Sequence, residues 1–136
     1  MGMISTISGM SDEDIAWAES LGKKYEGEHL GKGDAARHLA LGYLAANARF
    51  NNDYLFNPMA LAQMREIGFD TIENEMDRRN NKLGFFISAM TSDRAEAEKI
   101  IDKMMQAVTE ARTPEEAKAS SLPVTVRKGT PGNNYY

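Results

Sequence analysis

The chain is organised around the segment Glu75-Met76-Asp77-Arg78-Arg79-Asn80-Asn81-Lys82-Leu83-Gly84-Phe85. This segment combines charged residues, two adjacent asparagines and a glycine, although the apolar residues around it recur at helical spacing. Asparagine side chains compete for backbone hydrogen bonds and glycine has high backbone entropy, so together they cost a helix very roughly 1–2 kcal/mol relative to alanine. A helix that tolerates this cost has a use for those polar groups. Partners for these groups are therefore expected elsewhere in the sequence.

Apolar spacing predicts a helix over residues 71–91, with Asp70 as its N-cap and Glu73 as the capping partner. At Asn80-Asn81 three outcomes stay open, since the helix could break, bulge or continue there. The same spacing and similar capping signals predict four more helices and a short sixth, over residues 12–25, 34–50, 58–67, 93–112 and 114–119. The expected caps include Ser11, with Asp14 three residues on, Thr91 or Ser92 before residue 93, and Thr113 before Pro114.

The fold class that follows is all-α, a compact bundle of five helices plus a short sixth in one domain of residues 11–119. A chain of 136 residues is long enough for a single hydrophobic core. Residues 1–10 show no helical period and are expected to form an extended arm. Residues 120–136 contain two prolines and two glycines and are expected to form an extended tail, in which Val124–Val126 is a candidate strand.

Composition limits the classes of partner. The net charge of −4 argues against a general binder of nucleic acid, which usually carries a basic patch. No apolar run approaches the length of a membrane span, and residues 1–10 lack the basic region of a secretory signal. These features leave the compartment open, and a virion or the bacterial cytoplasm would both fit. Other protein subunits, contacted through the two arms, are the expected partners.

Several familiar sites are absent from the sequence. With no cysteine and two histidines, a closed structural zinc site would need unusual carboxylate ligands, and no HExxH or GxSxG pattern occurs. The glycine-rich residues 26–33 lack the spacing and the Ser or Thr of a phosphate-binding loop. No metal and no cofactor are therefore expected.

Two polar pairs remain as a candidate site. Asp34 and His38 are one helical turn apart, so the carboxylate can bond the imidazole and favour its cation. Asp77 and Asn81 repeat this spacing in the central segment. If the helices over residues 34–50 and 71–91 pack through their apolar stripes, the two polar faces border one groove. The candidate catalytic and substrate-binding residues are then His38, Asp34 and Asp77, and Arg37, Asn80 and Asn81, respectively.

The two segments resemble an uncharacterised family of small helical domains found in phage, bacterial envelope and toxin-like bacterial proteins. The likeness rests on Asp34-x-x-Arg37-His38 and on Met76-Asp77-x-x-Asn80-Asn81-x-x-Gly84, and it spans residues 33–87. Members carry a His-Glu pair between these motifs, but this chain has none there, and Arg65-Glu66 is the nearest stand-in. The resemblance implies that Asp34, Arg37, His38, Asp77, Asn80 and Asn81 form one site.

Two functions are consistent with these features. The first is a small hydrolase-like domain, phage- or secretion-associated, that acts on a cell-envelope polymer with His38 as acid or base. General acid or base catalysis contributes typically about 10²–10⁴-fold to a rate. The second is a non-catalytic structural or interaction protein of a phage virion or other assembly, which docks through its arms. In that case the asparagines lock helices together through buried hydrogen bonds.

Overall fold

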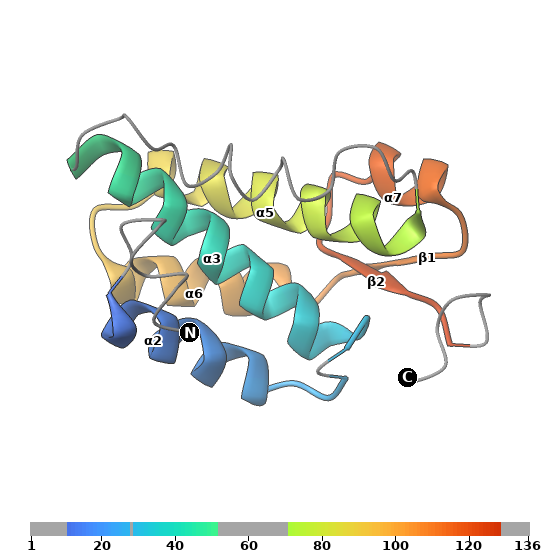
Figure 1. Cartoon of the computed structure of the whole chain (residues 1–136), viewed down its shortest axis with the longest axis horizontal. Coiled ribbons are helices and arrows are strands. Elements are labelled where there is room, and N and C mark those ends of the chain that lie inside the picture. The colour runs from blue at the N-terminus through green and yellow to red at the C-terminus, as the bar shows by residue number, and fades with distance from the viewer. Residues whose placement is uncertain (1–10, 28, 52–70, 129–136) are drawn as a thin grey trace.

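The computed structural model describes residues 11–27, 29–51 and 71–128, and the mainly helical prediction is confirmed (Figure 1). The elements are α2 (Asp12–Lys23), α3 (Lys32–Asn51), α5 (Ile72–Met90), α6 (Arg94–Met104), β1 (Thr109–Ala111), α7 (Pro114–Ala119) and β2 (Val124–Val126). The predicted arm at residues 1–10 and the predicted helix at 58–67 lie outside the described residues.

Helix α3 is the centre of the molecule, with α2 on one side of it and α5 on the other (Figure 1). The contacts between α3 and α5 show that these two helices run in the same direction. His38 meets Asn81 near the start of the contact, and Asn47 accepts a hydrogen bond from Ser88 further along both helices. Equivalent turns of α3 and α5 therefore face each other, which allows residues one turn apart on each helix to form a single cluster.

Two glycines allow α3 and α5 to approach closely. A Cβ atom at Gly42 would overlap the backbone of Asn81, and one at Gly84 would overlap the backbone of Leu39. The contact is reciprocal, since each helix supplies a glycine that faces the main chain of the other. Short polar side chains can therefore bridge the two helices, because the backbones are close.

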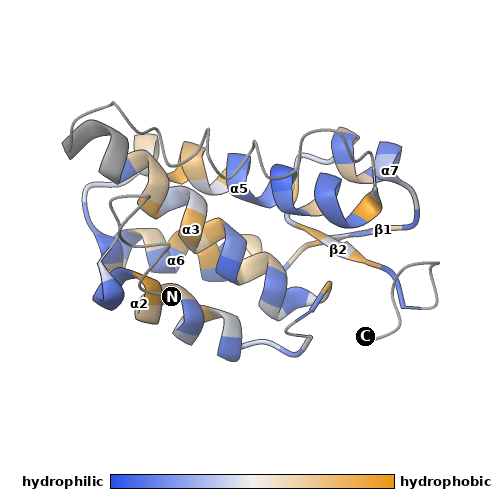
Figure 2. Ribbon diagram, in the orientation of Figure 1, coloured by the Kyte–Doolittle hydropathy of each residue, from blue (hydrophilic) through white to orange (hydrophobic). Residues whose placement is uncertain are grey.

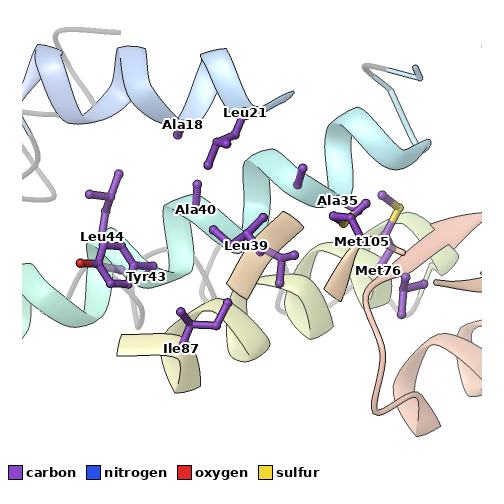
Figure 3. Close-up of a cluster of buried hydrophobic side chains, with 14 of the residues drawn as sticks. Ala18, Leu21, Ala35, Leu39, Ala40, Tyr43, Leu44, Met76, Ile87 and Met105 are labelled. Carbon is purple, nitrogen blue, oxygen red and sulfur yellow. The ribbon is translucent and has the colours of Figure 1, made fainter. Parts of the chain in front are cut away.

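The core lies between the helices and is built largely from alanine and leucine. Figure 3 shows Ala18 and Leu21 of α2 facing α3, with Ile87 and Met76 of α5 on the other side. Apolar colour is concentrated toward the interior and hydrophilic colour on outward turns (Figure 2). None of the helices in the described ranges is long and apolar enough to cross a membrane.

Most helix boundaries follow the capping signals. Ser11 forms a capping box with Asp14, and Thr113 caps the short helix that starts at Pro114, as expected. Two predicted caps were wrong. Thr71 rather than Asp70 caps α5, and Asp93 rather than Thr91 or Ser92 caps α6, because in each case this side chain accepts the backbone N–H three residues on. Helix α5 continues unbroken through the asparagine pair.

The buried face of α5 differs from the stripe that helical spacing predicts, which is Ile72, Met76, Leu83, Ile87 and Met90. Leu83 is only partly buried and Met90 is exposed, together with Phe86. The buried positions include Ile72, Met76, Asn80 and Gly84, which recur every four residues. Asn80 therefore occupies a core position, because its polar atoms find partners there.

The C-terminal part departs most from the prediction. The helix expected over residues 93–112 ends at Met104, because residues 109–111 instead pair in parallel with Val124–Val126, the strand anticipated in the tail. Both valines are fully buried. Of the predicted tail, residues 120–128 belong to the folded domain, so the boundary expected at residue 119 is too early. The rest of that tail lies outside the described residues.

Candidate functional site

The candidate site lies at the interface of α3 and α5, where two predicted pairs meet. Asp34 and His38 are one turn apart on α3, and Asp77 and Asn81 are one turn apart on α5. The parallel arrangement of the helices brings all four side chains together. We call these four residues, with Arg37, the His38 centre.

His38 is held through both ring nitrogens. Its Nδ1 lies 2.9 Å from Asn81 Oδ1. Its Nε2 lies 3.4 Å from Asp34 Oδ1 and 3.3 Å from Asp77 Oδ1. Because the amide oxygen can only accept, Nδ1 carries a proton and Nε2 faces the two carboxylates. The side chains of His38 and Asp77 are 17% and 15% exposed, so the centre reaches the surface at these two residues.

Asp34 also organises the loop before α3. Its Oδ2 accepts the backbone N–H of Leu30 at 2.9 Å, and its Oδ1 accepts a hydrogen bond from Arg37 at 2.6 Å. Leu30 has a φ of 64°, a left-handed conformation that costs a non-glycine residue roughly 1–2 kcal/mol. The carbonyl of Leu30 accepts the N–H of Val126. Asp34 thus stabilises a strained turn and links it to β2.

The charges in the centre favour a protonated imidazole. Burial alone would lower the pKa of His38, but the hydrogen bond to Asp34 and the charges of Asp77 and Asp34 outweigh it and raise that pKa to about 9. Burial likewise would raise the pKa of Asp34, but the hydrogen bond and charge of His38, with help from the Leu30 N–H and Arg37, lower it. At neutral pH the centre therefore contains an imidazolium ion between two carboxylates.

Asn80 is not part of this centre, which corrects its assignment as a substrate-binding residue. Its side chain is fully buried, donates to the carbonyl of Val124 at 2.8 Å and accepts the N–H of Val124 at 2.7 Å. Both polar ends are therefore used by the backbone of β2. We call this interaction the Asn80 clamp.

Some residues that shape the site were missed from the sequence. Gly42 and Gly84 set the distance between the helices, and Gly42 lies one turn beyond His38, which is a signal that the sequence does contain. The contact of Leu30 with Asp34 has no sequence signal, because leucine rarely adopts a positive φ. Glu75 is also buried and bonds Arg78 one turn away.

The centre also contains a set of atoms that suits a metal ion. One ligand atom from each of Asp34, His38 and Asp77 lies within 4.8 Å of the others.

The chain was compared with family models, curated proteins and solved structures, and none of them matches it.

Proposed function

We propose that this chain is a small hydrolase-like domain that acts on a cell-envelope polymer, with His38 as the proton-transferring group. The supporting observation is the position of His38 Nε2 between the carboxylates of Asp34 and Asp77 at the edge of the helical interface. Two motifs about forty residues apart in the sequence supply this arrangement. The resemblance to domains of envelope, toxin-like and phage proteins is the reason for choosing an envelope polymer.

The electrostatics of the centre favour an acid role for His38 rather than a base role. An imidazole with a pKa of about 9 carries its proton at neutral pH and can give it to a leaving group. Asp77, the more exposed of the two carboxylates, is the group that would accept a proton from the attacking water. In this scheme the oxygen of a water molecule bonds to the electrophilic carbon of the scissile linkage while the bond from that carbon to the leaving atom breaks. One proton of the water goes to Asp77, and the Nε2 proton of His38 goes to the leaving atom. Asp34 holds the imidazolium in place.

The test uses purified peptidoglycan sacculi carrying a covalent dye as the probe. We expect the full chain to release soluble dye and His38→Gln to release it at least about 100-fold more slowly. Lys24→Met is the matched control, because Lys24 forms exposed ion pairs with Glu98 and Asp102 of α6, none of which belongs to the His38 centre. Circular dichroism checks that each variant is folded. Absence of release by the natural chain, or equal release by His38→Gln, would refute the hydrolase proposal.

A second candidate is a structural or interaction protein, and one observation favours it. The carboxylate of Asp34 is bonded by Leu30, Arg37 and His38, so part of the centre serves to hold the fold. Under this proposal the outer residues 1–10 and 129–136 contact neighbouring subunits. Removing both segments should leave the melting temperature unchanged and abolish co-purification of subunits with the protein from its native source. Retention of those subunits by the shortened chain would refute it.

A further inference from the structure

The strongest additional feature is the set of ligand atoms around His38 Nε2. Asp34 and His38 come from successive turns of α3, and Asp77 comes from the facing turn of α5. The three atoms lie within 4.8 Å of one another. One imidazole nitrogen and two carboxylate oxygens form a donor set that suits zinc and related divalent transition metals.

The orientation of the His38 ring gives independent support. Its Nδ1–H is donated to Asn81 Oδ1 at 2.9 Å, which directs Nε2 toward both carboxylates. Histidines that ligate metals are usually held in this way, with the other ring nitrogen donating to an oxygen. Asn81 lies on the opposite helix from His38 and is not itself one of the ligands. The ring is therefore oriented by a contact that a metal would not displace.

The distances around Nε2 also fit a metal. The separations of 3.4 and 3.3 Å from the two carboxylate oxygens are longer than the roughly 2.7–2.9 Å of charge-assisted hydrogen bonds. Ligand atoms at about 2.0–2.1 Å from a tetrahedral zinc ion are separated from one another by about 3.3–3.4 Å. The two separations from Nε2 thus match the spacing of zinc ligands.

We propose that the His38 centre binds a divalent transition cation of the Zn²⁺ class through His38 Nε2, Asp34 Oδ1 and Asp77 Oδ1, in place of the proton on Nε2. From the sequence alone no metal was expected, because the chain has no cysteine, two histidines and no HExxH pattern. This inference goes beyond the proposed hydrolysis, since it needs only the three ligand atoms.

Substitution of Arg37 should change the affinity for the ion in the opposite direction to substitution of a ligand. Its guanidinium lies 2.6 Å from the Asp34 oxygen that would ligate the ion. A positive charge beside a dication opposes binding, so Arg37→Gln should strengthen it, whereas loss of a ligand should weaken it. A nonspecific surface site or a variant that merely loosens the fold would not give this pair of opposite effects.

The experiment measures ZnCl₂ binding to the chelator-treated full chain by isothermal titration calorimetry. We expect one ion per chain, binding at least about 10-fold weaker in Asp77→Asn and His38→Gln, and several-fold tighter binding in Arg37→Gln. Glu98→Gln is the matched control, because it removes a carboxylate of the exposed α2–α6 ion pairs and should leave the affinity unchanged. The proposal is overturned if the natural chain binds no Zn²⁺, or if Asp77→Asn and His38→Gln bind Zn²⁺ as tightly as the natural chain does.

A second measurement does not depend on any variant folding. In the natural chain, nitrogen NMR of the imidazoles should show the His38 Nε2 resonance changing with ZnCl₂ while Nδ1 keeps its proton. Unchanged His38 resonances at saturating ZnCl₂ overturn the proposal. Dye release from sacculi separates the two proposals when it is measured with chelator and with ZnCl₂, because a bound ion would replace the Nε2 proton that the hydrolysis needs and should therefore slow the release. Zn²⁺ binding with no dye release even in chelator refutes only the hydrolase, and dye release by a chain that binds no Zn²⁺ refutes only the metal site.

Discussion

Asn80 and Asn81 are neighbours on α5, yet they have different tasks. Asn80 is fully buried and bonds the two backbone groups of Val124, with no charged partner. Asn81 bonds the ring of His38, which lies between the carboxylates of Asp34 and Asp77 and is partly exposed at the surface. An asparagine side chain thus holds the backbone of a strand by hydrogen bonds at one position, and orients the imidazole of a charged centre at the next. Residue type alone does not assign a function, because the partner decides it.

The substitution with the largest expected effect on stability disrupts the contacts of both asparagines at once. Gly42→Val places a side chain against the backbone of Asn81 and forces α3 and α5 apart. We expect the free energy of unfolding to fall by at least about 4 kcal/mol, or the chain to fail to fold, as measured by urea denaturation. Ala89→Val is the control, since it adds the same β-branched side chain to an exposed position of α5. A Gly42→Val chain of natural stability would show that the helices need no close contact.

The next effect separates the two asparagines. Asn80→Ala leaves both backbone groups of buried Val124 without their partner, and each such loss costs about 1–3 kcal/mol. We expect Asn80→Ala to lower the free energy of unfolding by about 3 kcal/mol and Asn81→Ala by about 1–2 kcal/mol. Urea denaturation of both variants measures the difference. If Asn81→Ala is the more harmful of the two, the Asn80 clamp is not the main structural tie.

The third effect belongs to the His38 centre and appears as a pH dependence. The pKa of His38 is about 9 in the folded chain, whereas its ordinary value is 6.5. The stabilisation that protonated His38 gives to the folded state is therefore fully present below pH 6.5 and is lost as pH rises through about 9. The difference corresponds to at most about 3 kcal/mol. Asp34, whose pKa is lowered, stabilises the fold above its ordinary value of 3.8 and loses that contribution as pH falls further.

Stability measured by urea denaturation from pH 6 to pH 10 tests this prediction. His38→Gln should remove most of the decline between pH 6.5 and 9, while Asn80→Ala should lower stability by a similar amount across that range. A natural chain with flat stability from pH 6 to 10, or an unchanged decline in His38→Gln, would contradict the electrostatic description of the centre.

Much of this arrangement could be predicted from the sequence, because its cause is local. Helical spacing and caps such as Ser11 and Thr113 act within a few residues, and the spacing of Asp34 to His38 and Asp77 to Asn81 is set by one helical turn. The contact between the two pairs was anticipated from the polar faces of their helices. The contacts of Asn80 were not, because a buried amide that bonds a strand 44 residues away leaves no local pattern.

The remaining misses share that cause. The helix expected to run to residue 112 contains good helix formers, but pairing with Val124–Val126 draws residues 109–111 into a strand. Tertiary pairing overrides propensity there, since the strand partner is buried. The φ of Leu30 likewise depends on Asp34 and Val126 rather than on leucine itself.

The smallest expected effect on stability concerns ion pairs that resemble those of the His38 centre but are exposed to solvent. Lys24 on α2 pairs with Glu98 and Asp102 on α6 at 2.6 and 3.1 Å, with side chains that are well exposed. Exposed ion pairs are typically worth about 0.2–1 kcal/mol and weaken in salt. Lys24→Met should therefore lower the free energy of unfolding by less than about 1 kcal/mol, and this difference should shrink when urea denaturation is repeated in 1 M NaCl, where the screening length is about 3 Å. The effect of His38→Gln should persist in the same salt, because its carboxylates are shielded from solvent. Equal salt sensitivity at the two places would mean that burial does not distinguish the His38 centre from an ordinary surface network.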